Sequence, residues 1–242
     1  MIYVCEYDGS FDALTLQRIS EQFPLTFPEG WQSGRKREKA RQRILAWLLL
    51  AYGIEQAGAD IRCQTRIFQS LQIKRDVHGK PFSVRHPELS FNLSHCDTAC
   101  ACIIGNNSVG VDVERKFPYK ENLERSFCHP KEQAILETLN LAKREKQQQI
   151  LWSLKESLVK LNGRGIGYGL KNIDLSEFLP IIDGKHQILI QMEPGQYTVC
   201  VQTDENYTLA ACTASHMCIT DMNVEKVTEN ELSMWIKKES IY

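Results

Sequence analysis

The sequence predicts a mixed α/β fold, and its helix and strand signals on either side of about residue 110 permit two similar lobes that meet there. Strand-like alternation of apolar residues occurs near both ends of the chain, helical spacing occurs in both halves, and short strand signals cluster in the middle. The chain has 242 residues, enough for one large domain or two small ones that each bury a core. We place the N-terminal lobe at residues 1–110 and the C-terminal lobe at residues 111–242.

The N-terminal lobe begins with a strand signal followed by a helix signal. Residues 2–7 alternate and predict a strand. Residues 35–52 predict a helix, which we expect Gly53 to end. Its apolar residues recur at spacings of four and three, at Ile44, Leu48 and Ala51.

The middle of the chain is rich in turn and strand signals. Residues 62–70 are ambiguous, whereas His78-Gly79 ahead of Pro81 indicates a turn. Strands are expected at residues 90–93 and 98–104. The Gly105–Ser108 segment is expected to turn the second of these strands into a hairpin with residues 109–113.

The second half predicts helices followed by strands. A helix is expected to begin near Pro130, because proline suits the first helical position and Glu132 lies where the helix dipole favours an acid. A longer helix is expected over residues 144–161, ended by Asn162-Gly163. Three alternating segments predict strands in the tail, at residues 187–192, 197–202 and 207–214.

Composition narrows the classes of function. A net charge of -1 excludes a general attraction to nucleic acid or to a membrane, so a bound anion requires a local basic cluster. No apolar run approaches the roughly 20 residues that span a bilayer, and we expect a cytoplasmic protein. The nine cysteines form no CxxC pair, which favours free thiols. Cys96, Cys100 and Cys102 are expected to be core residues rather than metal ligands.

The segment VGVDVE places Asp112 and Glu114 two residues apart on an expected strand. Their side chains therefore point to the same face, where two carboxylates repel each other unless a cation or a proton intervenes. Magnesium suits such oxygen ligands and commonly completes its shell with substrate phosphates. By itself, such a pair is more often a solvated strand face, because acidic residues are mostly exposed.

The segment LWSLKESLVKLNGRG places Trp152, Glu156 and Lys160 on one face of the longer helix, at spacings of four. Glu156 can supply a further metal oxygen or accept a proton, and Lys160 can hold a phosphate. A solvated Glu–Lys pair is the competing interpretation.

Two further groups of residues suit phosphate. Basic residues crowd the start of the first helix, where they oppose the helix dipole, and Arg35, Lys39 and Arg43 share a face there. In FNLSHCD, the side chains of Ser94 and His95 can donate to phosphate oxygens. Adjacent strand residues point to opposite faces, so this pair does not indicate a hydrolase triad.

The order of these motifs is more informative than each motif alone. The basic helix, GKPF, FNLSHCD, VGVDVE and WSLKESLVKLNGRGIG follow one another over residues 35–170. This order resembles the surfactin-synthetase-activating type of 4′-phosphopantetheinyl transferase. The resemblance implies two similar α/β lobes in a pseudo-twofold arrangement, with coenzyme A and magnesium bound in the cleft between them.

The resemblance also implies roles for individual residues. Asp112, Glu114 and Glu156 look like the metal ligands. Lys160 and His95 look like ligands of the phosphate groups of coenzyme A, and Lys80 and Ser94 look like contacts of its nucleotide part. Arg43, with one or both of Lys36 and Lys39, resembles the clamp on the 3′-phosphate.

The implied reaction is attack by a carrier-protein serine on the β-phosphorus of coenzyme A, which releases adenosine 3′,5′-bisphosphate. Either Glu132, which matches an acid in the corresponding helix of the family, or Glu156 with a metal-bound water can accept the serine proton. The serine belongs to an apo acyl or peptidyl carrier protein of fatty acid, polyketide or nonribosomal peptide synthesis. We expect the transferase to be a monomer, with the tail at residues 235–242 as one place for a carrier to dock.

Two other classes of function fit the same residues. A metal-dependent phosphoesterase also uses carboxylates beside a basic patch, but it needs a second metal or an activated water. A non-catalytic module that only binds carrier proteins predicts that Asp112→Ala leaves all measurable behaviour unchanged. The family resemblance instead predicts loss of magnesium-dependent turnover with the fold retained.

Overall fold

The computed structural model describes residues 1–21, 23, 25, 27, 30–57, 70–163, 169–181, 186–192, 195–214 and 222–238. The ambiguous positions 62–69 and the last tail residues, 239–242, lie outside the described residues. None of the described helices is both long and apolar enough to cross a membrane.

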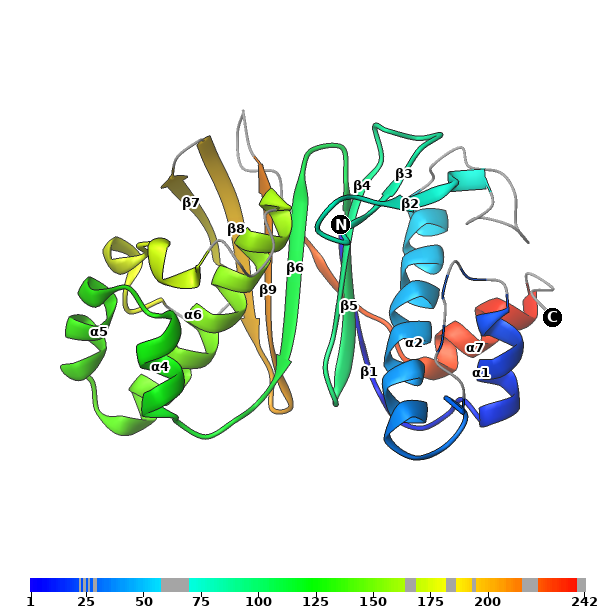
Figure 1. Ribbon diagram of the computed structural model, residues 1–242, viewed down its shortest axis with the longest axis horizontal. Helices are drawn as coiled ribbons and strands as arrows, with labels where there is room; N and C mark the ends of the chain where they lie inside the picture. The colour runs from blue at the N-terminus through cyan, green and yellow to red at the C-terminus, as the bar shows by residue number, and fades with distance from the viewer. Residues whose placement is uncertain are drawn as a thin grey trace.

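The described elements form a mixed α/β fold, as the sequence predicts (Figure 1). The helices are α1 (Ala13–Ser20), α2 (Gly34–Gln56), α4 (Glu121–Phe127), α5 (Pro130–Glu137), α6 (Leu141–Asn162) and α7 (Glu229–Lys238), with short 3-10 helices η2 (Leu170–Asn172) and η3 (Ser176–Phe178). The strands are β1 (Ile2–Glu6), β2 (Ile73–Arg75), β3 (Pro81–Ser83), β4 (Ser90–His95), β5 (Ala99–Gly105), β6 (Val109–Arg115), β7 (His186–Met192), β8 (Gly195–Thr203), β9 (Tyr207–Ala214) and β10 (Val224–Lys226).

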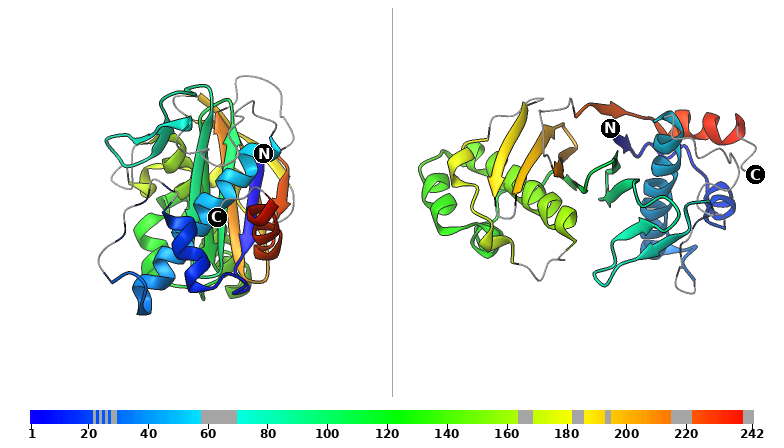
Figure 2. Two further views of the ribbon diagram at one scale, coloured as in Figure 1. Left: turned by 90° about the vertical axis from the view of Figure 1, so that its right-hand side faces the viewer. Right: turned by 90° about the horizontal axis from the view of Figure 1, so that it is seen from above.

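Two four-stranded sheets lie back to back in the centre of the molecule, in the orders β10-β1-β5-β4 and β6-β9-β8-β7. Apolar residues of both sheets share one core cluster, which includes Val4, Ile103, Val111 and Leu209. Helix α2 packs against the first sheet and α6 against the second, so the two long helices lie on opposite sides (Figures 1 and 2). This arrangement brings the two edge strands β4 and β6 together between the helices.

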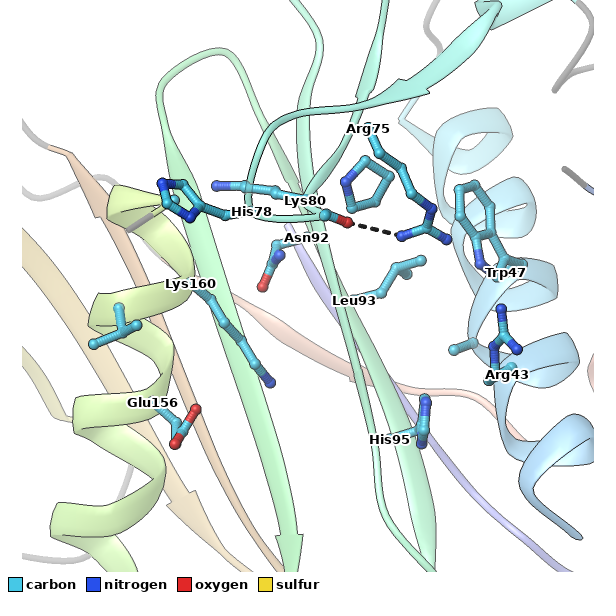
Figure 3. A pocket seen from close by; sticks show the side chains of 15 residues that line it. Arg43, Trp47, Arg75, His78, Lys80, Asn92, Leu93, His95, Glu156 and Lys160 are labelled. Atoms are coloured by element: carbon cyan, nitrogen blue, oxygen red, sulfur yellow. Dashed lines mark hydrogen bonds between the residues drawn. The ribbon is translucent and has the colours of Figure 1, made fainter. Parts of the chain in front are cut away.

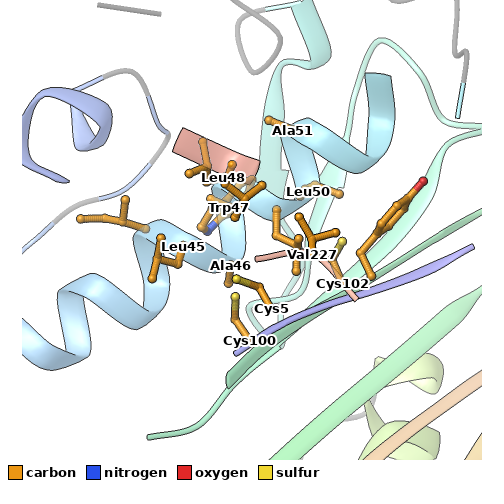
Figure 4. Packing of buried hydrophobic residues seen from close by; sticks show 14 of the residues in the cluster. Cys5, Leu45, Ala46, Trp47, Leu48, Leu50, Ala51, Cys100, Cys102 and Val227 are labelled. Atoms are coloured by element: carbon orange, nitrogen blue, oxygen red, sulfur yellow. The ribbon is translucent and has the colours of Figure 1, made fainter. Parts of the chain in front are cut away.

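The core beneath α2 explains why this helix is longer than the sequence suggests. The prediction that Gly53 ends it was wrong, because α2 continues to Gln56. A Cβ atom at Gly53 would lie 2.7 Å from the ring of Tyr3, so the glycine allows close packing on β1. Cys5, Cys100 and Cys102 pack in the same core (Figure 4). Cys96, Cys100 and Cys102 are all buried, which confirms their prediction as core residues.

The predicted hairpin between residues 98–104 and 109–113 was also wrong. Both strands exist, but β5 pairs with β1 on one side and with β4 on the other. Because both edges of β5 are already paired, β6 pairs with β9 in the second sheet instead. The turn at Gly105–Ser108 therefore connects two sheets.

The C-terminal residues return to the first sheet. Strand β10 pairs in parallel with β1, and Leu232 and Ile236 of α7 join the core beneath α2. An ion pair between Arg41 and the buried Glu229 also joins α7 to α2. The lobe boundary at residue 110 stays a prediction, and residues 224–238 pack with the sheet of the N-terminal lobe.

Candidate active site

A cavity of about 460 Å³ lies between α2 and α6, beside β4 (Figure 3). It is lined by residues from both long helices, from β4 and from the turn between β2 and β3. The sequence-predicted site residues among them are Arg43, Lys80, His95, Glu156 and Lys160. Segments far apart in the sequence thus converge at this cavity.

Polar side chains join β4 to β6 next to the cavity. The side-chain oxygen of Asn92 accepts from the backbone N–H of Val111 at 2.9 Å. Ser94 Oγ donates to Asp112 Oδ1 at 3.0 Å. Asn92, Ser94 and Asp112 are all buried, so these bonds are shielded from water. They hold the edges of the two sheets in a defined register.

The acidic residues from β6 face helix α6, as their spacing predicts. Asp112 Oδ1 accepts from Lys160 Nζ at 2.7 Å, and Glu114 Oε1 accepts from Trp152 Nε1 at 3.3 Å. The second oxygen of Asp112 is buried and bonds to none of the described residues. A buried carboxylate oxygen without a partner is costly, so this atom is suited to a cation.

Electrostatic repulsion links Asp112, Glu114 and Glu156. Burial and then the charge of Asp112 raise the pKa of Glu114 to about 6, and Glu156 contributes in the same direction. Burial and the charge of Asp112 also raise the pKa of Glu156, against the lowering effect of Lys160. Within the described ranges, no three acidic, histidine or cysteine side chains are grouped closely enough to hold a metal by themselves. The chemistry of these donors fits magnesium if a ligand supplies further oxygens.

Replacing Glu114 with glutamine is expected to stabilise the protein in a chelating buffer, because it removes a repelled charge and keeps an acceptor for Trp152. We expect the free energy of unfolding at pH 8 to rise by about 1 kcal/mol. Because the folded pKa of Glu114 is raised to about 6, its charge destabilises the fold above that pH. The penalty falls as the pH drops below about 6 and is small near pH 4, where the carboxyl is mostly protonated in both the folded and the unfolded state.

Denaturant unfolding at the two pH values measures this difference. Glu121→Gln is the matched control, since Glu121 is exposed and pairs with Arg125 on the surface of α4. A stability gain that is equal at pH 4 and pH 8 would contradict the electrostatic origin.

Positive charge gathers on the α2 side of the cavity. Burial and the nearby Arg75 lower the pKa of Arg43, so two guanidinium groups repel each other here. Burial, Lys160 and Arg43 lower the pKa of His95 to about 4, which leaves its imidazole neutral near pH 7. A neutral imidazole keeps one N–H donor for an anionic ligand. Lys36 and Lys39 belong to α2 but do not line the cavity.

Lys80 lines the cavity, but its ammonium group is bonded to the protein. Lys80 Nζ donates to the backbone oxygens of Val109 at 2.9 Å and Leu161 at 3.1 Å. Figure 3 shows the side chain directed toward α6. The nucleotide contact that the family resemblance implies for Lys80 stays a prediction.

Glu132 lies apart from the other candidates, in the core of the second half. It is fully buried and pairs with Lys155 at 2.6 Å. Its carboxylate also accepts from the backbone N–H groups of His129 and Leu175, and it completes a capping box at the start of α5. These contacts join α5, α6 and the segment before η3, which is the environment of a structural residue.

Several cavity residues are not singled out by the sequence. Trp47 lies one turn of α2 after Arg43. Arg75 and His78 precede the GKPF segment, and Asn92 belongs to FNLSH. Asn92 could have been found from its place in that motif. Trp47 could also have been found, because its spacing of four from Arg43 places both on one face of α2. Arg75 and His78 gave no signal of a site, because only the folding of the β2–β3 hairpin brings them to the cavity.

Comparison with known proteins identifies one family. Residues 108–212 match the model of the 4'-phosphopantetheinyl transferase superfamily. A 4'-phosphopantetheinyl transferase of Bacillus subtilis is 26% identical over 205 residues, which cover 81% of this chain and 83% of that protein. One from Bacillus pumilus is 28% identical over 72% of this chain and 71% of its own length, and one from Aneurinibacillus migulanus is 25% identical over 68% and 67%. These matches confirm the resemblance inferred from the motifs.

Proposed function

We propose that this chain, whose residues 108–212 match the model of the 4'-phosphopantetheinyl transferase superfamily, transfers the phosphopantetheine arm of coenzyme A to a serine of an apo carrier protein. The observation that best supports this function is the cavity between α2 and α6. Its α6 wall carries Glu156 and Lys160, and the opposite wall carries Arg43 and Arg75. Such a cavity suits a ligand that has separate phosphate groups.

We propose that Asp112, Glu114 and Glu156 hold magnesium together with the diphosphate of coenzyme A. The unpartnered oxygen of Asp112 and the mutual repulsion of these carboxylates support this assignment. Magnesium, when bound, would neutralise charge on the diphosphate. The cavity between α2 and α6 corresponds to the cleft of a two-lobed fold with its boundary near residue 110.

The phosphate groups of coenzyme A would contact donors on both walls. Lys160 and His95 suit the diphosphate, since both lie near the carboxylates. Arg43 suits the 3′-phosphate on the opposite wall, and Arg75 is a better second cation there than Lys36 or Lys39, because it lines the cavity. Guanidinium groups bind phosphate through paired hydrogen bonds, which favours this assignment.

In the proposed reaction, the serine oxygen forms a bond to the β-phosphorus of coenzyme A. The bond from that phosphorus to the bridging oxygen breaks, and adenosine 3′,5′-bisphosphate leaves. The serine proton passes to the carboxylate of Glu156, whose side chain lines the cavity. We favour Glu156 over Glu132 because the carboxylate of Glu132 is occupied by its own structural contacts. Lys160 stays beside the reacting phosphate and stabilises its charge.

Mass spectrometry of a carrier protein tests this function. Incubation of the chain with coenzyme A, magnesium and an apo carrier is expected to add about 340 daltons to the carrier, the approximate mass of the transferred arm. A carrier whose acceptor serine is replaced by alanine, and a reaction with a chelator, serve as controls. No mass gain on any of several carriers would contradict the proposal, and hydrolysis of coenzyme A without a carrier would favour a phosphoesterase.

A further inference from the structure

The turn between β2 and β3 is tied to the opposite half of the molecule by Lys80. Both acceptors of its ammonium group lie there, since Val109 begins β6 and Leu161 lies in the last turn of α6. The last carbonyl groups of a helix have no partner within the helix, and the helix dipole favours a cation at that end. Burial lowers the pKa of Lys80, in keeping with an ammonium group shielded from water.

The base of the β2–β3 hairpin is anchored in the first half of the chain. Ser83 Oγ donates to the backbone oxygen of Leu71 at 2.7 Å, and both residues are buried. Each strand has only three residues, and a two-stranded ribbon of this size is marginal by itself. Val77 at the tip is 94% exposed, so the tip gains little from apolar burial. The position of the tip therefore depends on polar contacts.

The turn is internally rigid, so a movement of Lys80 moves its neighbours. Asp76 Oδ1 accepts from the backbone N–H groups of His78 and Lys80, each at 2.9 Å. Arg75 Nη1 donates to the backbone oxygen of Gly79 at 2.8 Å. Arg75, His78 and Gly79 all line the cavity, and Figure 3 shows Arg75 beside Trp47 on the α2 side.

We propose that Lys80 is a positioning residue that ties the β2–β3 turn to the ends of β6 and α6 and thereby holds Arg75 and Gly79 in the wall of the coenzyme A cavity. This role needs no direct contact between Lys80 and the ligand. The identity of the ligand rests on the proposed function, whereas the tie itself rests on the two hydrogen bonds of the ammonium group.

Hydrogen exchange of the protein without coenzyme A tests the tie directly. Lys80→Met is expected to accelerate amide exchange in the turn at residues 76–80 by about tenfold or more, because two charge-assisted hydrogen bonds are lost. Amides of α6 in the same sample are expected to change by less than about twofold, which separates local opening from general destabilisation. Lys74→Met is the matched control, since Lys74 is exposed on β2 and does not line the cavity.

An exchange rate at residues 76–80 that stays within about twofold of the original protein would overturn the proposal, as would an equal acceleration by Lys74→Met. A lysine that only contacts the ligand would not alter this turn in the ligand-free protein. This result does not depend on any assay of transfer.

Kinetics provide the second test. Lys80→Met is expected to raise KM for coenzyme A by about tenfold and to change kcat by less than about threefold, because Glu156 and Lys160 stay on α6. Lys80→Arg keeps a charged donor and is expected to restore most of the affinity. A large fall in kcat with unchanged KM would contradict a positioning role. If the original protein modifies no carrier, the proposed function fails while the exchange experiment still decides the role of Lys80.

Discussion

Replacing Asp112 with asparagine is expected to lower kcat for carrier modification by roughly three orders of magnitude while the protein stays folded. The substitution removes the negative charge beside Glu114 and Glu156, and so removes a ligand for magnesium. Asparagine still offers an oxygen to Lys160 and Ser94, which bond to Oδ1 of Asp112. The local packing is therefore expected to persist.

Thermal unfolding provides a readout that does not need turnover. The original protein is expected to melt at a higher temperature with magnesium and coenzyme A together, because ligands that bind only the folded state stabilise it. Asp112→Asn is expected to lose the magnesium-dependent part of this shift. Asp97→Asn is the matched control, since Asp97 lies on the surface at a strand turn. A variant that keeps both turnover and the magnesium-dependent shift would refute the assigned metal ligands.

Replacing Gly110 with alanine is expected to destabilise the fold strongly, because β6 packs directly on the backbone of α6 at this residue. The new Cβ would lie 2.0 Å from the backbone oxygen of Ser157 and 2.6 Å from the backbone nitrogen of Leu161. Both atoms belong to the backbone of α6 and cannot rotate away, so the whole helix must move from β6. We expect a loss of about 4 kcal/mol in the free energy of unfolding, at the upper end for a point substitution.

Thermal unfolding measures this effect, and a fall of about 10 °C in Tm is expected for a chain of this size. Gly195→Ala is the control, because no heavy atom of the described residues lies within 4 Å of its added Cβ. Turnover should fall together with stability, because α6 carries Glu156 and Lys160. A Tm within about 2 °C of the original protein would show that α6 does not pack on β6 as closely as described.

The chemistry of the candidate site could be predicted from the sequence because its signals are local. Two residues separated by one position on a strand share a face, and residues four apart on a helix share a face. Asp112 and Glu114 share one face of β6 and Glu156 and Lys160 share one face of α6, because each pair depends only on the periodicity of its own element. The contact between Asp112 and Lys160 joins the two faces, and the role of the three acids as metal ligands stays a prediction. The long helices and most strands follow from the same periodicities.

Other features depended on segments that are distant in the sequence. Strands β5 and β6 belong to different sheets, because β1 and β4 already pair with the two edges of β5. A close contact with Tyr3 explains why α2 has a glycine at position 53, where the sequence alone predicts the end of the helix. Local sequence signals predict neither the pairing of β5 with β1 nor the contact of Gly53 with Tyr3, because the partners in each case lie about 50 residues apart or more.

The sequence by itself determined which chemical groups this protein offers to a phosphorylated ligand, because side-chain periodicity is a local property of strands and helices. Only the tertiary structure decided where each charged side chain lies and which partner it contacts. It directed the ammonium group of Lys80 to the end of α6, placed Glu132 in a buried ion pair, and brought Arg75 into the cavity. The physical reason is that a charged group binds the partner that folding brings within hydrogen-bonding distance, and these partners lie in other elements of the chain.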